Sequence, residues 1–155
     1  MSENRRDFIK ASGAAGLLAA AGLLGAEPAI AQQPARNKAA FETKNVNDTV
    51  KALGGGSVAE SKDIAITAPD IAENGAVVPV SVASKIPNTQ AVYIMVEKNP
   101  NTLAAGFNIP QGTEASVTTR IKMGQTSNVY AVVKADNKFF MSSKEVKVTI
   151  GGCGG

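Results

Sequence analysis

From residue 63 onward, apolar and polar side chains alternate with a period of two, and this pattern constrains the fold more than any other feature. The alternation begins at Asp63 and continues almost to the C-terminus. The apolar positions are Ile64, Ile66, Val78, Val80, Val82, Val92, Ile94, Val96, Ala115, Val117, Ile121, Met123, Val129, Ala131, Val133, Val146, Val148 and Ile150. Successive residues of a β-strand point to opposite faces, so each run predicts a strand that buries one face.

Turn residues separate these runs. They are Glu73-Asn74-Gly75, Asn99-Pro100-Asn101, Pro110-Gln111-Gly112 and Asp136-Asn137. The Asp-Asn pair predicts a tight hairpin, because both residues tolerate positive φ. Roughly seven short strands with such spacing predict an all-β fold over residues 63–150, an immunoglobulin-like antiparallel β-sandwich. Pro79 cannot donate to a ladder, so its strand is expected at a sheet edge.

A different pattern precedes the strands. Val46, Val50 and Leu53 recur at helical spacing, with Asn45 or Asn47 as the N-cap. The three glycines at residues 54–56 end this helix. Residues 32–62 are therefore predicted to be a polar leader followed by one short helix, within about residues 39–53.

Two strands carry apolar residues on both faces. Val77 backs the strand of Val78, and Tyr93 and Met95 back the strand of Val92. A two-layer sandwich normally leaves one face of each sheet in water. Either a partner protein or the N-terminal helix is expected to cover the second face.

Composition excludes several classes of function. The chain has no His and one Cys, so a conventional zinc site, a Cys-His pair and a Ser-His-Asp triad are ruled out. The net charge of +3 comes from 16 basic and 13 acidic residues without a long basic run, which argues against nucleic-acid binding. We expect a protein that is not an enzyme and holds no cofactor.

The first 31 residues have the parts of an export signal. Arg5 and Arg6 form a twin-arginine pair, an apolar stretch follows at residues 11–26, and Ala29-Ile30-Ala31 is a small-x-small cleavage site. This order predicts a Tat signal peptide over residues 1–31 and a periplasmic mature protein without a membrane anchor. An uncleaved anchor is the alternative, but the apolar stretch is shorter than the roughly 20 residues of a spanning helix. Because the Tat route exports folded proteins, a co-exported partner is also expected.

The chain ends in a cysteine between two pairs of glycines, directly after the last predicted strand: Gly151, Gly152, Cys153, Gly154 and Gly155. The four glycines add no bulk and restrain the backbone little, so residues 151–155 are predicted to be a flexible arm with a reach of roughly 16–18 Å. A thiolate is a good nucleophile, which makes Cys153 a candidate site for covalent attachment of a substrate. No basic residue lies within five positions, and the nearby terminal carboxylate disfavours the thiolate. Activation of this thiol would have to come from a partner.

Other roles for Cys153 are less consistent with its position. A cysteine between four terminal glycines is not expected in a core. Its spacing does not fit a prenylation or lipoprotein site. An intermolecular disulfide in the oxidising periplasm stays open and can coexist with carrier function.

Three stretches together resemble the SoxY family, the carrier subunits of the bacterial sulfur-oxidation (Sox) system. They are residues 52–55 (Ala-Leu-Gly-Gly), residues 68–80 (Ala-Pro-Asp-Ile-Ala-Glu-Asn-Gly-Ala-Val-Val-Pro-Val) and residues 151–155. The resemblance implies a periplasmic heterodimer with the β-sandwich subunit SoxZ. It also implies that a c-type haem enzyme, SoxXA, conjugates thiosulfate to Cys153 and that the hydrolase SoxB removes sulfate. A sulfane dehydrogenase then acts on the remaining sulfur in organisms that have one.

Rival functions come from other classes. An immunoglobulin-like structural or adhesive module would use Cys153 only to form a dimer. A thiol enzyme acting alone would need an activated thiol, which the glycine surroundings do not provide. A ligand-binding or chaperone-like sandwich would not need the tail.

Overall fold

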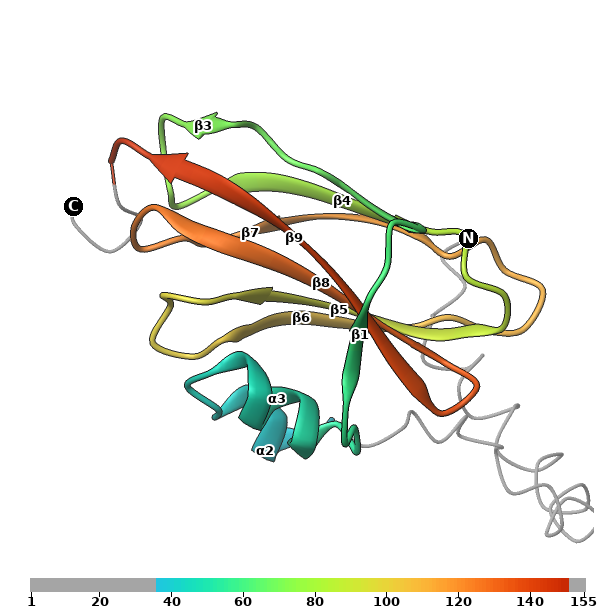
Figure 1. The fold of residues 1–155 in the computed structure, drawn as a ribbon. Helices are drawn as coiled ribbons and strands as arrows, with labels where there is room; N and C mark the ends of the chain where they lie inside the picture. The colour runs from blue at the N-terminus through green and yellow to red at the C-terminus, as the bar shows by residue number, and fades with distance from the viewer. Residues whose placement is uncertain (1–35, 151–155) are drawn as a thin grey trace, which may run out of the picture. The chain divides into compact units, whose positions relative to one another are not determined.

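The computed structural model describes residues 36–150 and consists of a β-sandwich with two short helices on one outer face (Figure 1). The larger sheet has six strands: β1 (Val58–Glu60), β9 (Lys138–Val148), β8 (Ser127–Ala135), β5 (Thr89–Val96) and β6 (Leu103–Asn108) in that order, with β3 (Ile71–Ala72) also paired to β9. The smaller sheet has the order β2 (Ile64–Thr67), β4 (Val78–Ser84), β7 (Ser116–Ile121). The predicted all-β sandwich is confirmed.

The predicted alternation buries one face of each sheet. Val78, Val80 and Val82 of β4 have no exposed surface, nor do Val92, Ile94 and Val96 of β5. These two sets belong to one hydrophobic core that fills the space between the sheets. Burying a Val or Ile side chain contributes about 1.5–3 kcal/mol relative to leaving it in water.

The hairpin between β8 and β9 forms at the predicted place. Asp136 and Asn137 both adopt positive φ, 46° and 60°. The ladder that leaves this turn pairs Ala135 with Lys138 at one end and Ser127 with Val146 at the other. It is antiparallel, whereas β1 and β3 pair with β9 in parallel, a detail that the alternation alone does not predict.

Pro79 does not lie on an edge strand as expected, because β4 is the central strand of the smaller sheet. The backbone explains this. The amide of Ser84 donates to Ala115 at the start of β7, and amide direction alternates along a strand. The nitrogen of Pro79 therefore points to the β2 side, where pairing stops at Ser81. Its missing N–H costs no ladder hydrogen bond.

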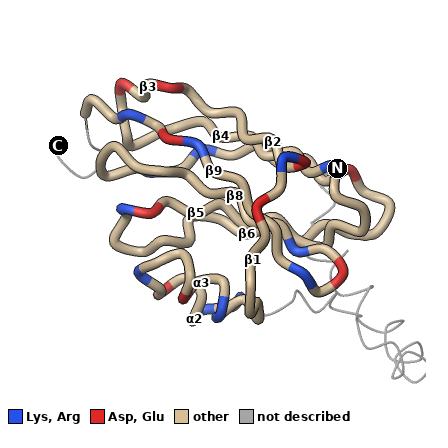
Figure 2. Tube along the Cα trace, in the orientation of Figure 1, with Lys and Arg blue, Asp and Glu red and all other residues tan. Residues whose placement is uncertain are grey.

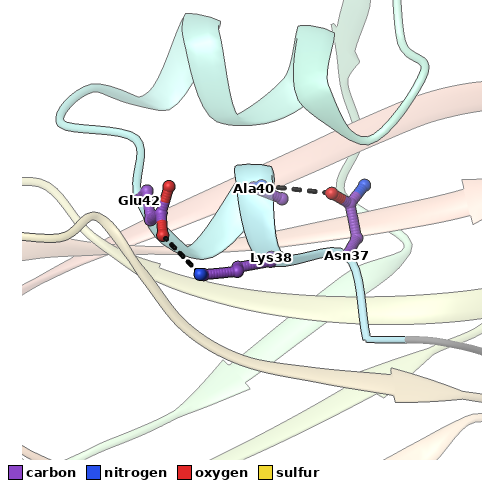
Figure 3. Close-up of polar contacts among 4 residues, drawn as sticks. All are labelled: Asn37, Lys38, Ala40 and Glu42. Atoms are coloured by element: carbon purple, nitrogen blue, oxygen red, sulfur yellow. Dashed lines mark hydrogen bonds and ion pairs between the residues drawn. The ribbon is translucent and has the colours of Figure 1, made fainter.

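Two helices stand where one was predicted: α2 (Lys38–Phe41) and α3 (Val46–Ala52). Each has an asparagine N-cap. Asn37 accepts from the amide of Ala40 at 3.2 Å, and α2 also carries the exposed Lys38–Glu42 ion pair at 3.9 Å (Figure 3). Asn45, one of the two predicted caps, accepts from the amide of Asp48 at 2.8 Å. Its extended backbone, with φ −147°, separates the two helices.

The helices cover the outer face of the larger sheet (Figure 1). Met95 is fully buried in a second cluster with Val50 of α3 and Phe139 of β9, and Tyr93 packs against this cluster. Burial raises the pKa of Tyr93 above its usual value. Of the two predicted alternatives, the helices therefore cover this second face. Val77, by contrast, stays exposed.

Helix α3 ends in a Schellman turn at the predicted glycines. The amide of Gly54 donates to Lys51 and that of Gly55 to Val50, both at 2.9 Å, while Gly54 takes a positive φ of 88°. A Cβ atom on Gly55 would lie 2.5 Å from Val50 Cγ1 and 3.0 Å from the Phe139 ring. Gly56 has nothing within 4 Å of the same position.

This contrast predicts that Gly55→Ala lowers the free energy of unfolding by about 1–3 kcal/mol, because the added methyl separates α3 from β9. Gly56→Ala is the matched control and should change it by no more than about 0.5 kcal/mol. Urea unfolding of the two variants measures the difference. Equal effects would show that this contact does not hold the helix on the sheet.

Candidate functional site

The predicted attachment site and arm lie outside the described residues, so Cys153 and its four glycines remain predictions: Gly151, Gly152, Gly154 and Gly155. The same holds for Arg5 and Arg6 of the export signal. The described chain ends at Ile150, directly before the predicted arm. The candidate site is therefore the part of the sandwich from which this arm starts.

Strand β9, an interior strand of the larger sheet, leads to Ile150. Its partner β8 accompanies it as far as the pair Ser127–Val146. Val146 is fully buried in the inter-sheet core. On the opposite edge, β3 pairs Ile71 with Lys147 and Ala72 with Val148.

Beyond Val146, where pairing with β8 stops, the chain is held by residues 70–75, which we call the strap. Its carbonyls at Asp70 and Ala72 accept from the amides of Lys147 at 2.9 Å and Thr149 at 3.1 Å. The amide of Gly75 donates to the carbonyl of Ile150 at 2.8 Å. Hydrogen bonding to the strap thus continues to the last described residue.

Side chains add to this arrangement. The Thr149 hydroxyl donates to the carbonyl of Glu73 in the strap at 3.0 Å. The Thr126 hydroxyl accepts from the amide of Val148 at 2.9 Å. Lys144 reaches across the edge of the sheet, donating to the Ala68 carbonyl at 2.6 Å and lying 3.0 Å from a carboxylate oxygen of Asp70. Asp70 is largely exposed, so the carbonyl contact is the more valuable of the two.

Sequence reasoning did not identify these contacts. The turn at Glu73-Asn74-Gly75 was predicted, but not that Gly75 would bond to the end of the chain. The strap lies within residues 68–80, one of the stretches that resemble the SoxY family, so the resemblance is the sequence signal that could have pointed to it.

Exposed apolar side chains gather at the same end of the sandwich. Among the described residues, the exposed large hydrophobics are Ile71, Val77 and Ile150, each more than half exposed. Figure 1 shows β3, the loop before β4 and the end of β9 at one end of the sandwich. The predicted arm therefore starts beside apolar surface.

A groove of about 590 Å³ lies between α3 and the larger sheet, lined by Val46, Val50, Lys51, Tyr130 and Met141 among others. Within residues 36–150, no group of three or more His, Cys, Asp or Glu side chains could hold a metal ion. In that same range no helix is both long and apolar enough to cross a membrane. Figure 2 shows basic and acidic residues interspersed along the chain.

Comparison with known proteins identifies relatives. Residues 49–153 match the model of the family described as sulfur oxidation protein SoxY, a range that ends at Cys153. Residues 4–24 match the TAT (twin-arginine translocation) pathway signal sequence. None of the curated protein sequences matches the chain.

A similar solved structure belongs to the same family. The sulfur carrier protein SoxY from Chlorobium limicola f thiosulfatophilum is 40% identical, with a TM-score of 0.59, and the match covers 66% of this chain and 96% of that one. A chain of a structure described as the structural basis of T cell specificity and activation by the bacterial superantigen toxic shock syndrome toxin-1 matches at 12% identity and a TM-score of 0.38, covering 55% of this chain and 98% of that chain. The second likeness is too slight to bear on function.

The Thr126 contact leads to a stability prediction. Thr126→Val keeps the shape of the side chain but leaves the half-buried amide of Val148 without its acceptor, which should lower the free energy of unfolding by about 1–3 kcal/mol. Thr118→Val, which removes an exposed hydroxyl contact to Ser81, is the control and should cost less than about 0.5 kcal/mol. Chemical denaturation distinguishes the two. A Thr126 variant as stable as the control would mean that water replaces the lost acceptor.

Proposed function

The chain belongs to the SoxY family of sulfur oxidation proteins, and from this membership we propose that it carries sulfur-oxidation intermediates covalently on Cys153. Its TAT signal directs export through the Tat pathway to the periplasm. The observation that carries the proposal is the Gly-Gly-Cys-Gly-Gly ending, which begins two residues after strand β9, where the backbone is hydrogen-bonded up to Ile150. A thiol placed three residues beyond a fixed point can enter a narrow site in another protein.

The chemistry balances with partners of the kind that the family resemblance implies. A Cys153 thiol and thiosulfate form a sulfur–sulfur bond, giving the S-thiosulfonate, one proton and two electrons. A c-type haem enzyme such as SoxXA accepts the electrons. Water then attacks the terminal sulfonate sulfur in a hydrolase such as SoxB, releasing sulfate and leaving a persulfide on Cys153. A sulfane dehydrogenase can act on that persulfide.

The role assigned to this chain is that of a carrier without catalytic groups of its own. With no His in the sequence, the usual general base near neutral pH is missing. The neighbours of Cys153, Gly152 and Gly154, neither activate the thiol nor hinder its entry into a pocket, and the same is true of Gly151 and Gly155. Each reaction therefore takes its base, metal or redox centre from a partner.

Partner binding needs surface, and two features support it. The exposed Ile71, Val77 and Ile150 lie where an enzyme that receives the arm has to approach. Export of an already folded chain through Tat allows a SoxZ-like subunit to leave the cytoplasm as part of a heterodimer. The outer face of the larger sheet is not the surface offered to that subunit near Met95, because α2 and α3 cover it.

The first prediction of this proposal concerns the thiol. Periplasmic protein from cells grown on thiosulfate should carry an S2O3 group or extra sulfur on Cys153 that a reductant removes. Cys153→Ser should carry none, because a hydroxyl cannot form the sulfur–sulfur bond. Intact-mass measurement without reductant, with sequencing of the tail peptide, tests both.

The same measurements distinguish the carrier from the rival function of a structural module. A structural or adhesive module joined through Cys153 would show a symmetric disulfide that Cys153→Ser abolishes, while thiosulfate oxidation by the cells stays unchanged. That result would overturn the carrier proposal. Gly56→Ala, an exposed change far from the tail in sequence, is the control for expression and export.

The second prediction concerns export. Changing Arg5 and Arg6 together to Lys should reduce the periplasmic fraction to background, because the Tat signal is read by a receptor and not by its charge alone. Lys10→Arg keeps the same charge outside the pair and should leave export intact. Fractionation followed by immunoblotting measures both. Normal export of the double-lysine variant would show that Arg5 and Arg6 are not the residues that are read.

A further inference from the structure

The strap, residues 70–75, has no part in the chemistry proposed for Cys153, yet it is hydrogen-bonded to the last residues before the tail. Ile71, the second residue of the strap, is exposed, which is unusual for a strand that serves only to fill a core. The backbone hydrogen bonds between the strap and the C-terminal residues are made to Lys147, Thr149 and Ile150. All three come after the end of the β8–β9 ladder.

We propose that the strap is a positioning element that sets where the carrier arm begins. This inference rests on the proposed carrier function of Cys153. Val146 is the last β9 residue paired with β8. Beyond it, the strap and the Thr126 hydroxyl are the described groups that hold the backbone. The bond from Gly75 to Ile150 places the start of the arm at residue 151 and not earlier.

Gly75 is itself anchored, which makes the strap a fixed support. Its carbonyl accepts from the amide of Met123 at 2.7 Å, and Met123 is fully buried in the inter-sheet core. Lys144 ties the entry to the strap through the Ala68 carbonyl. The strap therefore links the end of β9 to the core through Met123, and Lys144 of β9 links the strand to Ala68, two residues before the strap.

The position of the start matters because it sets the length of chain before the thiol. Three residues, 151–153, follow Ile150 and reach at most about 10 Å. If the strap let go, the Thr126 hydroxyl would still hold Val148, so residues 149–153 would be released, which is five residues. The effective concentration of a tethered group falls roughly as the −3/2 power of tether length, so delivery into a partner site should fall about 2-fold.

A purely structural role is the competing explanation, because Ala68 and Ala72 are buried in the core. Such a role predicts lower stability of the sandwich but an unchanged thiol. The test therefore has to measure the behaviour of Cys153 separately from stability.

Thr149 offers the most selective change. Thr149→Pro removes both the amide that donates to Ala72 and the hydroxyl that donates to Glu73. It leaves the β8–β9 ladder intact, since pairing ends at Val146. Thr149→Val removes only the hydroxyl contact and serves as the milder variant if the proline variant does not fold.

The experiment uses the mature chain with its co-purifying small subunit and the haem enzyme that conjugates thiosulfate. For Thr149→Pro we expect kcat/KM of conjugation to fall about 2-fold, mainly through KM. The rate of Cys153 with a small thiol reagent should stay as in the wild type, because reagent access does not depend on tether length. Hydrogen exchange at the amide of Gly75 should become faster.

Deleting Gly151 gives a readout that a structural role would not move. In the wild type the deletion shortens the reach by about 3.4 Å and should lower conjugation. In the Thr149→Pro background it removes surplus length and should raise conjugation. The opposite signs are the signature of a tether whose length the strap sets.

The inference is overturned if Thr149→Pro conjugates like the wild type although exchange at Gly75 is faster. It is also overturned if the Gly151 deletion has the same effect in both backgrounds. Absence of conjugation on wild-type Cys153 is a different result, because it rejects the proposed function itself. In that case, unchanged exchange at Gly75 in Thr149→Pro would also reject the anchoring.

Discussion

The pairing of β9 with β8 is the interaction on which the rest of this structure depends. It begins at a two-residue hairpin and runs from Ala135–Lys138 to Ser127–Val146. Phe139 on one face of β9 holds the helices, while Val146 on the other lies in the inter-sheet core. The far edge of the same strand takes β1 and β3. A strand held on two faces and two edges can serve as the base from which the C-terminal residues extend.

The sequence predicts what depends on local periodicity and misses what depends on distant partners. Six strands follow from alternation because each has one face in the core. β6 does not alternate, since Gly106 is needed where the Tyr93 ring lies 3.1 Å from a would-be Cβ. β1 and β3 have three and two residues and exist because β9, about eighty positions later, offers an edge. Pro79 was wrongly assigned to an edge strand because nothing local reveals where β2 stops.

The candidate site divides in the same way. The function of the tail is predicted from the sequence because a lone cysteine among four glycines has few other uses, and it stays a prediction because these residues lie beyond the described structure. The strap cannot be predicted from the sequence, because most of its contacts are made by backbone amides and carbonyls. Asn74 and Gly75 signal a turn, but the partner of that turn is Ile150, seventy-five positions away. Side-chain identity says little about a contact of this kind.

A carrier of this design depends on placement rather than on reactivity. An activated thiolate would react with oxidants in the periplasm as readily as with its intended substrates. A thiol without a neighbouring base reacts where a partner supplies one, so under the proposed function the glycine surroundings of Cys153 would themselves contribute to specificity. The remaining requirement is to bring that thiol to each partner at useful effective concentration. A short tether from a rigid end would meet this requirement, and in the proposed carrier the hydrogen bonds at Thr149 and Ile150 set where the tether begins.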